Sequence, residues 1–308
     1  MRCFAAFVVL CTACAPAARG QNASANLVTG VGYLYPPAAV APGQLISVFV
    51  AGNLQGDIGV TVQGLAAPVL EVRPPSSCSA LTICSSVTAI TIQIPYELGP
   101  ACLFTNPECA TNLSVLTQLI VTANGVAGTP VDLTPLGDQV HILTACDTVV
   151  PGGSGIVPFG QLPCMPLVTH ANGSLVAAGS PAQGGEELVV YAVGLGLTIP
   201  PVKTGQAATT ATPTYDPYRL DFNFRPNALA TQPLPLVLEP ASPPPDFSSP
   251  SYSGLVPGYA GLYQVNFVVP RPPAGLQACS GAVQSNLTVS IGGQTSFDGA
   301  GICVAPGE

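Results

Sequence analysis

Short runs of alternating apolar and polar residues, separated by Gly and Pro, follow one another along most of the chain. In Val87–Ile94 (VTAITIQI) the three isoleucines fall on one face, whereas Thr91 and Gln93 fall on the other, as the two-residue period of a β-strand requires. The further predicted strands are Gln44–Val50, Gly59–Gln63, Pro68–Val72, Leu116–Ala123, Glu187–Val193, Leu220–Phe224, Leu234–Glu239, Leu262–Val269 and Asn286–Ile291. No stretch of the sequence carries a capped, 3.6-residue apolar stripe, so the pattern predicts an all-β protein.

The order of these features repeats. APGQLISVFVAGNL (residues 41–54) is similar to QGGEELVVYAVGLG (183–196), and AITIQIP (89–95) is similar to QVNFVVP (264–270). Two copies of this length fit two tandem Ig-like β-sandwiches of short strands. The predicted first sandwich covers 21–135, a Gly/Pro-rich connection covers 136–183, and the second sandwich covers 184–308 with a Pro-rich insertion at about 205–250.

The composition limits the partners. Charged residues make up 7% of the chain, against about 25% in an ordinary soluble protein, and hydrophobic residues make up 48%. Beyond residue 20 the basic residues are scattered among fifteen acidic ones, and they are Arg73, Lys203, Arg219, Arg225 and Arg271. Nucleic-acid binding needs a basic patch, so we expect no nucleic-acid partner.

The first twenty residues, MRCFAAFVVLCTACAPAARG, have the pattern of a secretory signal peptide. A short positive start precedes an apolar stretch, and a small-x-small site precedes Gln21. We therefore expect a secreted product, extracellular, periplasmic or at the cell surface, without a later transmembrane segment. Lipid anchoring through Cys11 or Cys14 is the alternative.

Cysteines support export. Eight remain beyond the leader, namely Cys78, Cys84, Cys102, Cys109, Cys146, Cys164, Cys279 and Cys303. An even number in an exported chain indicates disulfides, although eight cysteines allow 105 pairings. Sequential pairing, 78–84, 102–109, 146–164 and 279–303, is the simplest. Zinc is the competing interpretation, but this part of the chain has no C-x₂-C pair and no cofactor is expected.

Catalytic motifs are weak. The closest approach to G-x-S-x-G, at residues 152–156, lacks its last glycine, and the sequence places no Asp to complete a triad with His141 or His170. Glu186 and Glu187 are adjacent, so on a strand they would face opposite sides. Asp298 is not part of a cluster of acidic residues in the sequence, such as a calcium site would need. We therefore assign no catalytic, cofactor or metal residue, and interpret both histidines as loop or strand-edge residues.

Two segments carry candidate binding residues. TYDPYRLDFNF (214–224) supplies Tyr215 and Tyr218 for stacking on a sugar, although its alternating Leu and Phe also suit core packing. GLVPGYAGLYQVNFVVP (254–270) predicts one buried face that begins at Tyr263, with Gln264 and Asn266 on the opposite face. Tyr259 is a candidate for the backbone-bonding tyrosine corner of Ig-like domains.

The stretches APGQLISVFVAGNL, APVLEV, ITIQIPYEL, NGSLVAAGSPAQGGEELVVYAVGLG and YSGLVPGYAGLYQVNFVVP resemble the uncharacterised Solibacter-type C-terminal domain of secreted acidobacterial proteins. The resemblance spans residues 40–291, with a long insertion and extra cysteines as departures. It implies an exported Ig-like module similar to IPT/TIG domains, and it brings no activity or catalytic residues.

These observations together predict a non-enzymatic exported protein with a structural or adhesive role. A carbohydrate-binding accessory module is the alternative, and a hydrolase without a recognisable motif is a third possibility. The expected partner is an extracellular polysaccharide or a surface protein.

Overall fold

The computed structural model describes residues 25–30, 38–75, 87–98, 117–147, 149–150, 164–231 and 248–307, and the regular structure in these ranges is all β. The leader, the predicted strand Leu234–Glu239 and four of the cysteines (Cys78, Cys84, Cys102 and Cys109) lie outside them. The earlier strands are β1 (Ala25–Gly30), β2 (Ala38–Val40), β3 (Leu45–Ala51), β4 (Ile58–Val62), β5 (Leu65–Ala67), β6 (Val69–Arg73), β7 (Val87–Gln93), β8 (Thr117–Ala123), β9 (Val126–Ala127) and β10 (Val131–Pro135). The later strands are β11 (His141–Ile142), β12 (Val168–His170), β13 (Glu187–Val193), β14 (Thr212–Pro213), β15 (Arg219–Asn223), β16 (Tyr252–Leu255), β17 (Tyr263–Val268), β18 (Leu287–Gly292) and β19 (Phe297–Ile302).

The first half of the chain forms two sheets around one core. One sheet has the order β1–β3–β7–β6, and the other has the order β2–β10–β8–β4–β5 with β9 paired to β8. All of these pairs are antiparallel except β2–β10, which is parallel. Fully buried aliphatic side chains from both sheets, such as Ile92 and Leu119, share the core between them.

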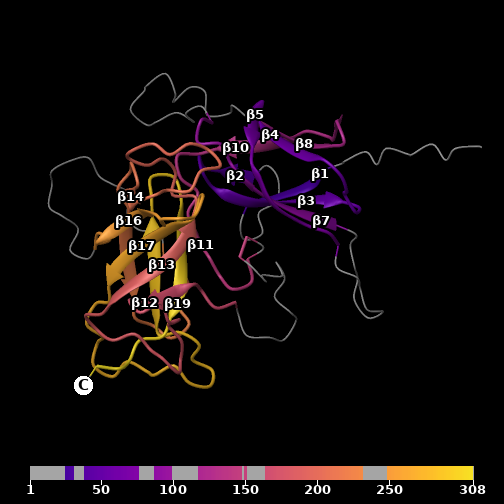
Figure 1. The fold of residues 1–308 in the computed structure, drawn as a ribbon. Helices are drawn as coiled ribbons and strands as arrows, with labels where there is room; N and C mark the ends of the chain where they lie inside the picture. The colour runs from indigo at the N-terminus through magenta and orange to yellow at the C-terminus, as the bar shows by residue number, and fades with distance from the viewer. Residues whose placement is uncertain are drawn as a thin grey trace, which may run out of the picture.

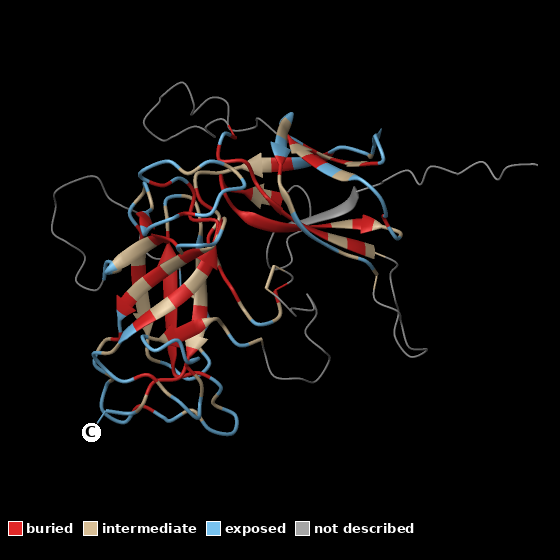
Figure 2. Ribbon diagram, viewed as in Figure 1, coloured by how far each residue is buried: buried red, intermediate tan, exposed pale blue. Residues whose placement is uncertain are grey.

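The second half repeats this plan with its own core. Its sheets have the orders β11–β13–β17–β16–β14, with β12 also paired to β13, and β15–β18–β19. Strands β11 and β12 lie within the segment 136–183, which the sequence suggested was a connection. Figure 1 shows the two halves side by side, the first from indigo to magenta and the second from pink through orange to yellow, and Figure 2 shows buried residues alternating along the strands.

The similar sequence stretches occupy equivalent positions. β3 pairs with β7 as β13 pairs with β17, and each pair is the centre of its sheet. Gly43 N–H donates to Ile94 O at 3.0 Å, and its counterpart Gly185 donates to Val269 O at 2.8 Å. Both glycines have positive φ, +74° and +85°, which glycine adopts without steric cost. The duplication seen in the sequence is therefore present in the backbone.

The two halves meet through polar contacts of buried and partly buried groups. Tyr96 Oη lies 3.2 Å from Tyr263 Oη, and the Tyr96 N–H donates to Thr204 Oγ1 at 2.8 Å. Gly205 N–H donates to Gln93 Oε1 at 2.7 Å. Gln93 is fully buried although it faces away from the isoleucines of β7. The period-two pattern of β7 is thus correct, and the second half covers the polar face of this strand at Gln93.

Apolar side chains complete this contact. Leu45 of β3 forms a small buried cluster with Leu143 and Val193 of the second half, and Tyr191 and Leu262 pack against it. Gly261 is needed here, because a Cβ at that position would lie 2.7 Å from Gly43 O. The contact therefore joins turns and strands of both halves.

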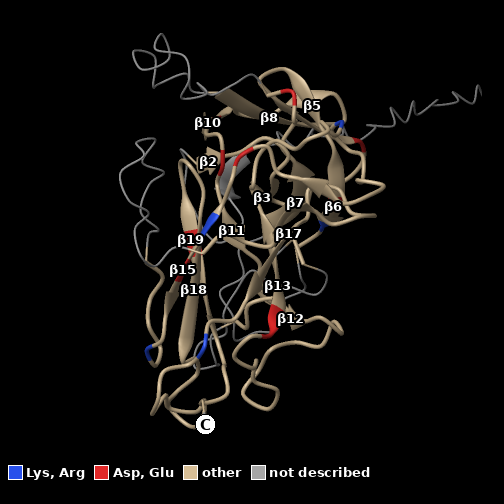
Figure 3. Ribbon diagram, turned by 90° about the vertical axis from the view of Figure 1, so that its left-hand side faces the viewer, with Lys and Arg blue, Asp and Glu red and all other residues tan. Residues whose placement is uncertain are grey.

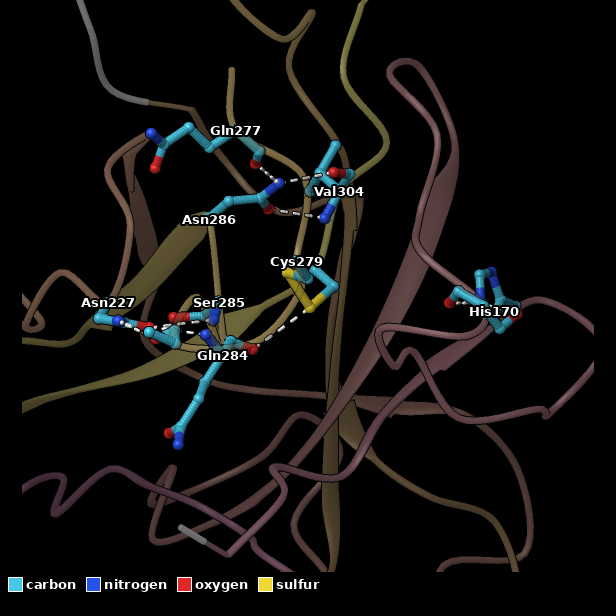
Figure 4. Close-up of a disulfide and its surroundings, with 11 residues drawn as sticks. His170, Asn227, Gln277, Cys279, Gln284, Ser285, Asn286 and Val304 are labelled. Carbon is cyan, nitrogen blue, oxygen red and sulfur yellow. Dashed lines mark hydrogen bonds between the residues drawn. A yellow bond between two sulfur atoms is a disulfide. The ribbon is translucent and has the colours of Figure 1, made fainter. Parts of the chain in front are cut away.

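Two predicted disulfides are present. Cys146–Cys164 and Cys279–Cys303 have Cα–Cα distances of 5.6 and 5.8 Å, within the normal range. Figure 4 shows the second bond beside Asn286, whose Nδ2 donates to Val304 O at 2.7 Å. Disulfides indicate an oxidising compartment. Within the described ranges, no helix has the length and apolar character needed to cross a membrane.

Candidate functional site

The strongest candidate for a binding surface is the outer face of β13, β17 and β16. Tyr263, Val265 and Phe267 of β17 are 0–1% exposed and point into the core, as the sequence predicted. The alternate residues Gln264 and Asn266 point the other way and are partly exposed. This face of the sheet is therefore where the second half presents polar groups.

Strand register places two tyrosines beside these amides. Gln264 pairs with Tyr191 of β13, and Asn266 pairs with Tyr252 of β16. Directly opposed residues in an antiparallel pair share a face and have Cβ atoms about 5 Å apart. We call Tyr191, Tyr252, Gln264 and Asn266 the amide–tyrosine patch. The two amides are predictable from the sequence and the tyrosines are not, because cross-strand neighbours depend on register rather than on sequence spacing.

The ring of Tyr252 lies along the sheet because Gly254 leaves room for it. A Cβ at Gly254 would lie 2.4 Å from Tyr252 Oη and 2.7 Å from Cζ. The hydroxyl donates to Leu255 O at 3.3 Å, which holds the ring against the strand. The ring is only partly buried. A phenol ring held flat on a sheet is suited to stacking against an apolar sugar face.

The side-chain amides of Gln264 and Asn266 have hydrogen-bonding groups left for a ligand. Gln264 Nε2 donates to Asn266 Oδ1 at 3.1 Å. Among the described residues, Gln264 Oε1 and Asn266 Nδ2 have no hydrogen-bond partner, so the patch offers one acceptor and one donor group. The nearest charge described on this face is Glu187, which accepts a hydrogen bond from Ser251 Oγ at 2.6 Å. Figure 3 shows how few charged residues the described part of the molecule carries.

The other predicted binding residues are separated. Tyr218 is 2% exposed, and its hydroxyl donates to Leu195 O at 2.8 Å inside the second core. Burial raises its pKa well above the usual value for tyrosine. Its ring is therefore not available for stacking. Leu220, two residues further along, is buried in the same core. Tyr215 is 56% exposed and lies just beyond β14, where its N–H donates to Leu197 O at 2.8 Å.

The tyrosine-corner prediction for Tyr259 is wrong. Its side chain is 59% exposed, because the turn at Pro257–Gly258 projects it outward. Tyr263 makes the buried hydroxyl-to-backbone bond instead, donating to Gly196 O. Gly196 has φ of +71°, a conformation that glycine adopts without steric cost.

His141 lies in an ionic cluster that the sequence did not reveal. Its Nδ1 is 3.2 Å from Asp298 Oδ2, and its Nε2 is 3.2 Å from Asp147 Oδ2 without the alignment of a hydrogen bond. Burial lowers the pKa of His141, but the two carboxylates outweigh it and raise the value to about 9. Asp298 Oδ2 also accepts from Ile142 N–H at 2.8 Å. His141 lies in β11 at the edge of its sheet, as interpreted from the sequence, but its pairing with Asp298 was not predicted, since β11 and β19 meet only in the folded chain.

This cluster has the geometry of a structural clamp. Asp147 is 3% exposed and also accepts from Thr144 Oγ1 at 2.9 Å. Its pKa is lowered by His141 and Thr144 against the opposing effect of burial. Among the described residues no group of three His, Cys, Asp or Glu side chains is arranged to hold a metal ion.

Comparison with protein-family models, with curated proteins and with solved structures finds no match.

Proposed function

We propose that each half is an Ig-like, IPT/TIG-like β-sandwich, as in the Solibacter-type family that the sequence resembles. Support comes from strand order. β1–β3–β7–β6 and β4–β8–β10 correspond to the A-B-E-D and C-F-G sheets of that fold. In the second half, β12–β13–β17–β16 and β15–β18–β19 correspond to the same sheets.

The tandem unit is, in this proposal, an exported, non-enzymatic protein whose main role outside the cell is structural or adhesive, and slow self-modification of one surface serine is compatible with that role. The observation that carries it is the amide–tyrosine patch, a partly exposed sheet face with free amide groups. The patch borders the contact between the halves, because Tyr191 packs against the Leu45–Leu143–Val193 cluster. Strands that are paired, buried on one side and fixed at the interface make a firm support for a binding face.

Cosedimentation tests the adhesive role. The mature chain, residues 21–308, is mixed with purified cell-envelope fragments and with insoluble polysaccharides, and the pelleted fraction is measured. We expect the wild type to pellet with one of these materials and the double variant Gln264→Ala/Asn266→Ala to stay in the supernatant. Tyr215→Ala is the matched control, because it removes an exposed tyrosine outside the patch. Equal pelleting of all three proteins, or no pelleting of the wild type, would contradict the proposal.

Carbohydrate binding is the second candidate, and the position of the Tyr252 ring favours it. Aromatic stacking beside an amide donor and acceptor is the chemistry by which proteins hold neutral sugars. If the ligand is a glycan, soluble oligosaccharides should release the pelleted protein, and Tyr252→Ala should weaken binding by removing the ring. If the ligand is a protein, oligosaccharides should leave the pellet unchanged.

A further inference from the structure

A second cluster of reactive groups lies on the hairpin between β12 and β13, away from the patch. His170 Nδ1 is 2.5 Å from Glu186 Oε1, and His170 Nε2 is 3.3 Å from Ser180 Oγ. Ser180 is exposed, and the side chains of His170 and Glu186 are 12% and 25% exposed. A hydroxyl, an imidazole and a carboxylate are thus connected in the order that activates a serine nucleophile.

The backbone explains how these three residues meet. After β12 the chain turns, with Gly173 N–H donating to His170 O at 2.9 Å. A second tight turn follows, in which Ala177 and Ser180 exchange N–H to O bonds of 3.1 and 3.0 Å, and it returns Ser180 to His170. Glu186 then lies in the turn before β13, where its Oε2 accepts from Gln183 N–H at 2.8 Å.

Two states of His170 are compatible with this geometry. When the ring is charged, Nε2–H donates to Ser180 O, which is 3.1 Å away, and the cluster only stabilises the hairpin. When the ring is neutral and Nδ1–H remains on Glu186, Nε2 carries a lone pair that accepts the Ser180 hydroxyl proton. The hydrogen bond to Glu186 raises the pKa of His170, so the neutral state needs a higher pH than it does in a free imidazole.

We propose that Ser180 is a nucleophile activated by His170, with Glu186 as the positioning residue, and that it reacts with small activated acyl and phosphonyl groups at the surface. With an acyl ester, the Ser180 Oγ–H proton passes to His170 Nε2 while Oγ forms a bond to the carbonyl carbon. The carbon–oxygen bond to the leaving alcohol then breaks, and the proton on Nε2 passes to that alcohol. Water hydrolyses the acyl-serine by the same proton route.

The turn also limits the rate of this reaction. Ser180 N–H donates to Ala177 O, so it is not free to stabilise the oxyanion. One missing oxyanion donor reduces turnover by about 10²–10³-fold in serine hydrolases. We therefore expect stoichiometric modification of Ser180 with slow release, and we expect acyl groups small enough to react without an enclosing pocket.

A fluorophosphonate probe tests the proposal on the mature chain with its disulfides intact. After incubation at pH 7 and pH 9, peptide mapping by mass spectrometry measures the modified fraction of each serine. Ser174 is the matched internal control, because it lies on the same hairpin but donates to Asn172 Oδ1 at 2.7 Å instead of to an imidazole. This comparison needs no variant, so it holds even where a substitution disturbs the hairpin.

We expect Ser180 to be modified at least 10-fold faster than Ser174, with the ratio larger at pH 9 than at pH 7. His170→Asn should lower the rate at Ser180 by about 10²-fold or more, the size of a general-base contribution. Glu186→Gln should lower it less and move the pH profile. Equal rates at Ser180 and Ser174, no adduct on Ser180, or an adduct on His170 itself would overturn the proposal. The cluster would then have only a structural role in the hairpin.

Discussion

Raising the pH should weaken the second half of the molecule through His141. The imidazole lies between Asp147 and Asp298, with 3.2 Å to each carboxylate, and its pKa is about 9. In the unfolded chain the pKa of histidine is about 6.5. A folded-state pKa above the unfolded value means that the folded protein binds the proton more tightly. The resulting stability is complete below pH 6.5 and is lost as the pH rises to about 9.

The magnitude follows from this difference. One pKa unit corresponds to 1.36 kcal/mol, so a rise from 6.5 to about 9 contributes about 3 kcal/mol to the free energy of unfolding. The steepest dependence should approach about 1.4 kcal/mol per pH unit. The pKa of Asp147 is lowered, so this carboxylate stays ionised throughout the range and the change belongs to the imidazole.

Urea unfolding followed by far-UV circular dichroism from pH 6 to pH 10 measures the effect in the mature chain. The reference is His141→Gln, which removes the titrating group and lowers stability at pH 6 because the buried carboxylate of Asp147 and the partly exposed carboxylate of Asp298 lose their partner. The pKa of His170 is also raised, but its contribution is common to both proteins and cancels in the difference. We expect the wild-type advantage to shrink by about 3 kcal/mol between pH 6.5 and 9.5. An advantage that stays constant with pH would refute the reasoning.

Three further predictions concern stability at neutral pH, each measured by the same urea titration. Tyr263→Phe should lower the free energy of unfolding by about 1–2 kcal/mol, because the carbonyl of Gly196 loses its buried donor; an unchanged midpoint would count against that bond. Asp138→Ala should lower the free energy of unfolding by about 2–3 kcal/mol, because this buried carboxylate accepts hydrogen bonds from three backbone N–H groups of the β18–β19 turn. A decrease below about 0.5 kcal/mol would be inconsistent with that role. Replacing Cys279 and Cys303 together by Ser should cost about 3 kcal/mol from the chain entropy of the 24-residue loop, and free thiols detected at these positions in the native protein would argue against the bond.

Much of the strand content could be predicted from the sequence. Runs such as residues 87–94 and 187–193 have long β-branched stretches with period two, and they form β7 and β13. Strands β2, β5, β9, β11 and β14 were missed because they have two or three residues each, too few for a period to show. Strand β19 was missed because its sequence, FDGAGI, is rich in glycine, and its pairing with β18 overrides that weak propensity.

The site could be predicted only in part. Alternation along one strand placed Gln264 and Asn266 on the outer face, because that information is local. Tyr191 and Tyr252 join them through cross-strand register, and His141 meets Asp298 across 157 positions of sequence. Such contacts depend on how β-strands align, which a single sequence does not encode in its spacing.

Hydroxyl-radical footprinting of the bound protein tests the central claim most directly, because it reports the exposure of single side chains. The mature chain is exposed to radicals with and without the envelope or polysaccharide material that it cosediments with. We expect binding to protect Tyr252 and Tyr191 from oxidation, while Tyr215 and Tyr259, which are 56% and 59% exposed outside the patch, react as before. Protection of Tyr215 or Tyr259 with no change at Tyr252 and Tyr191 would contradict the claim.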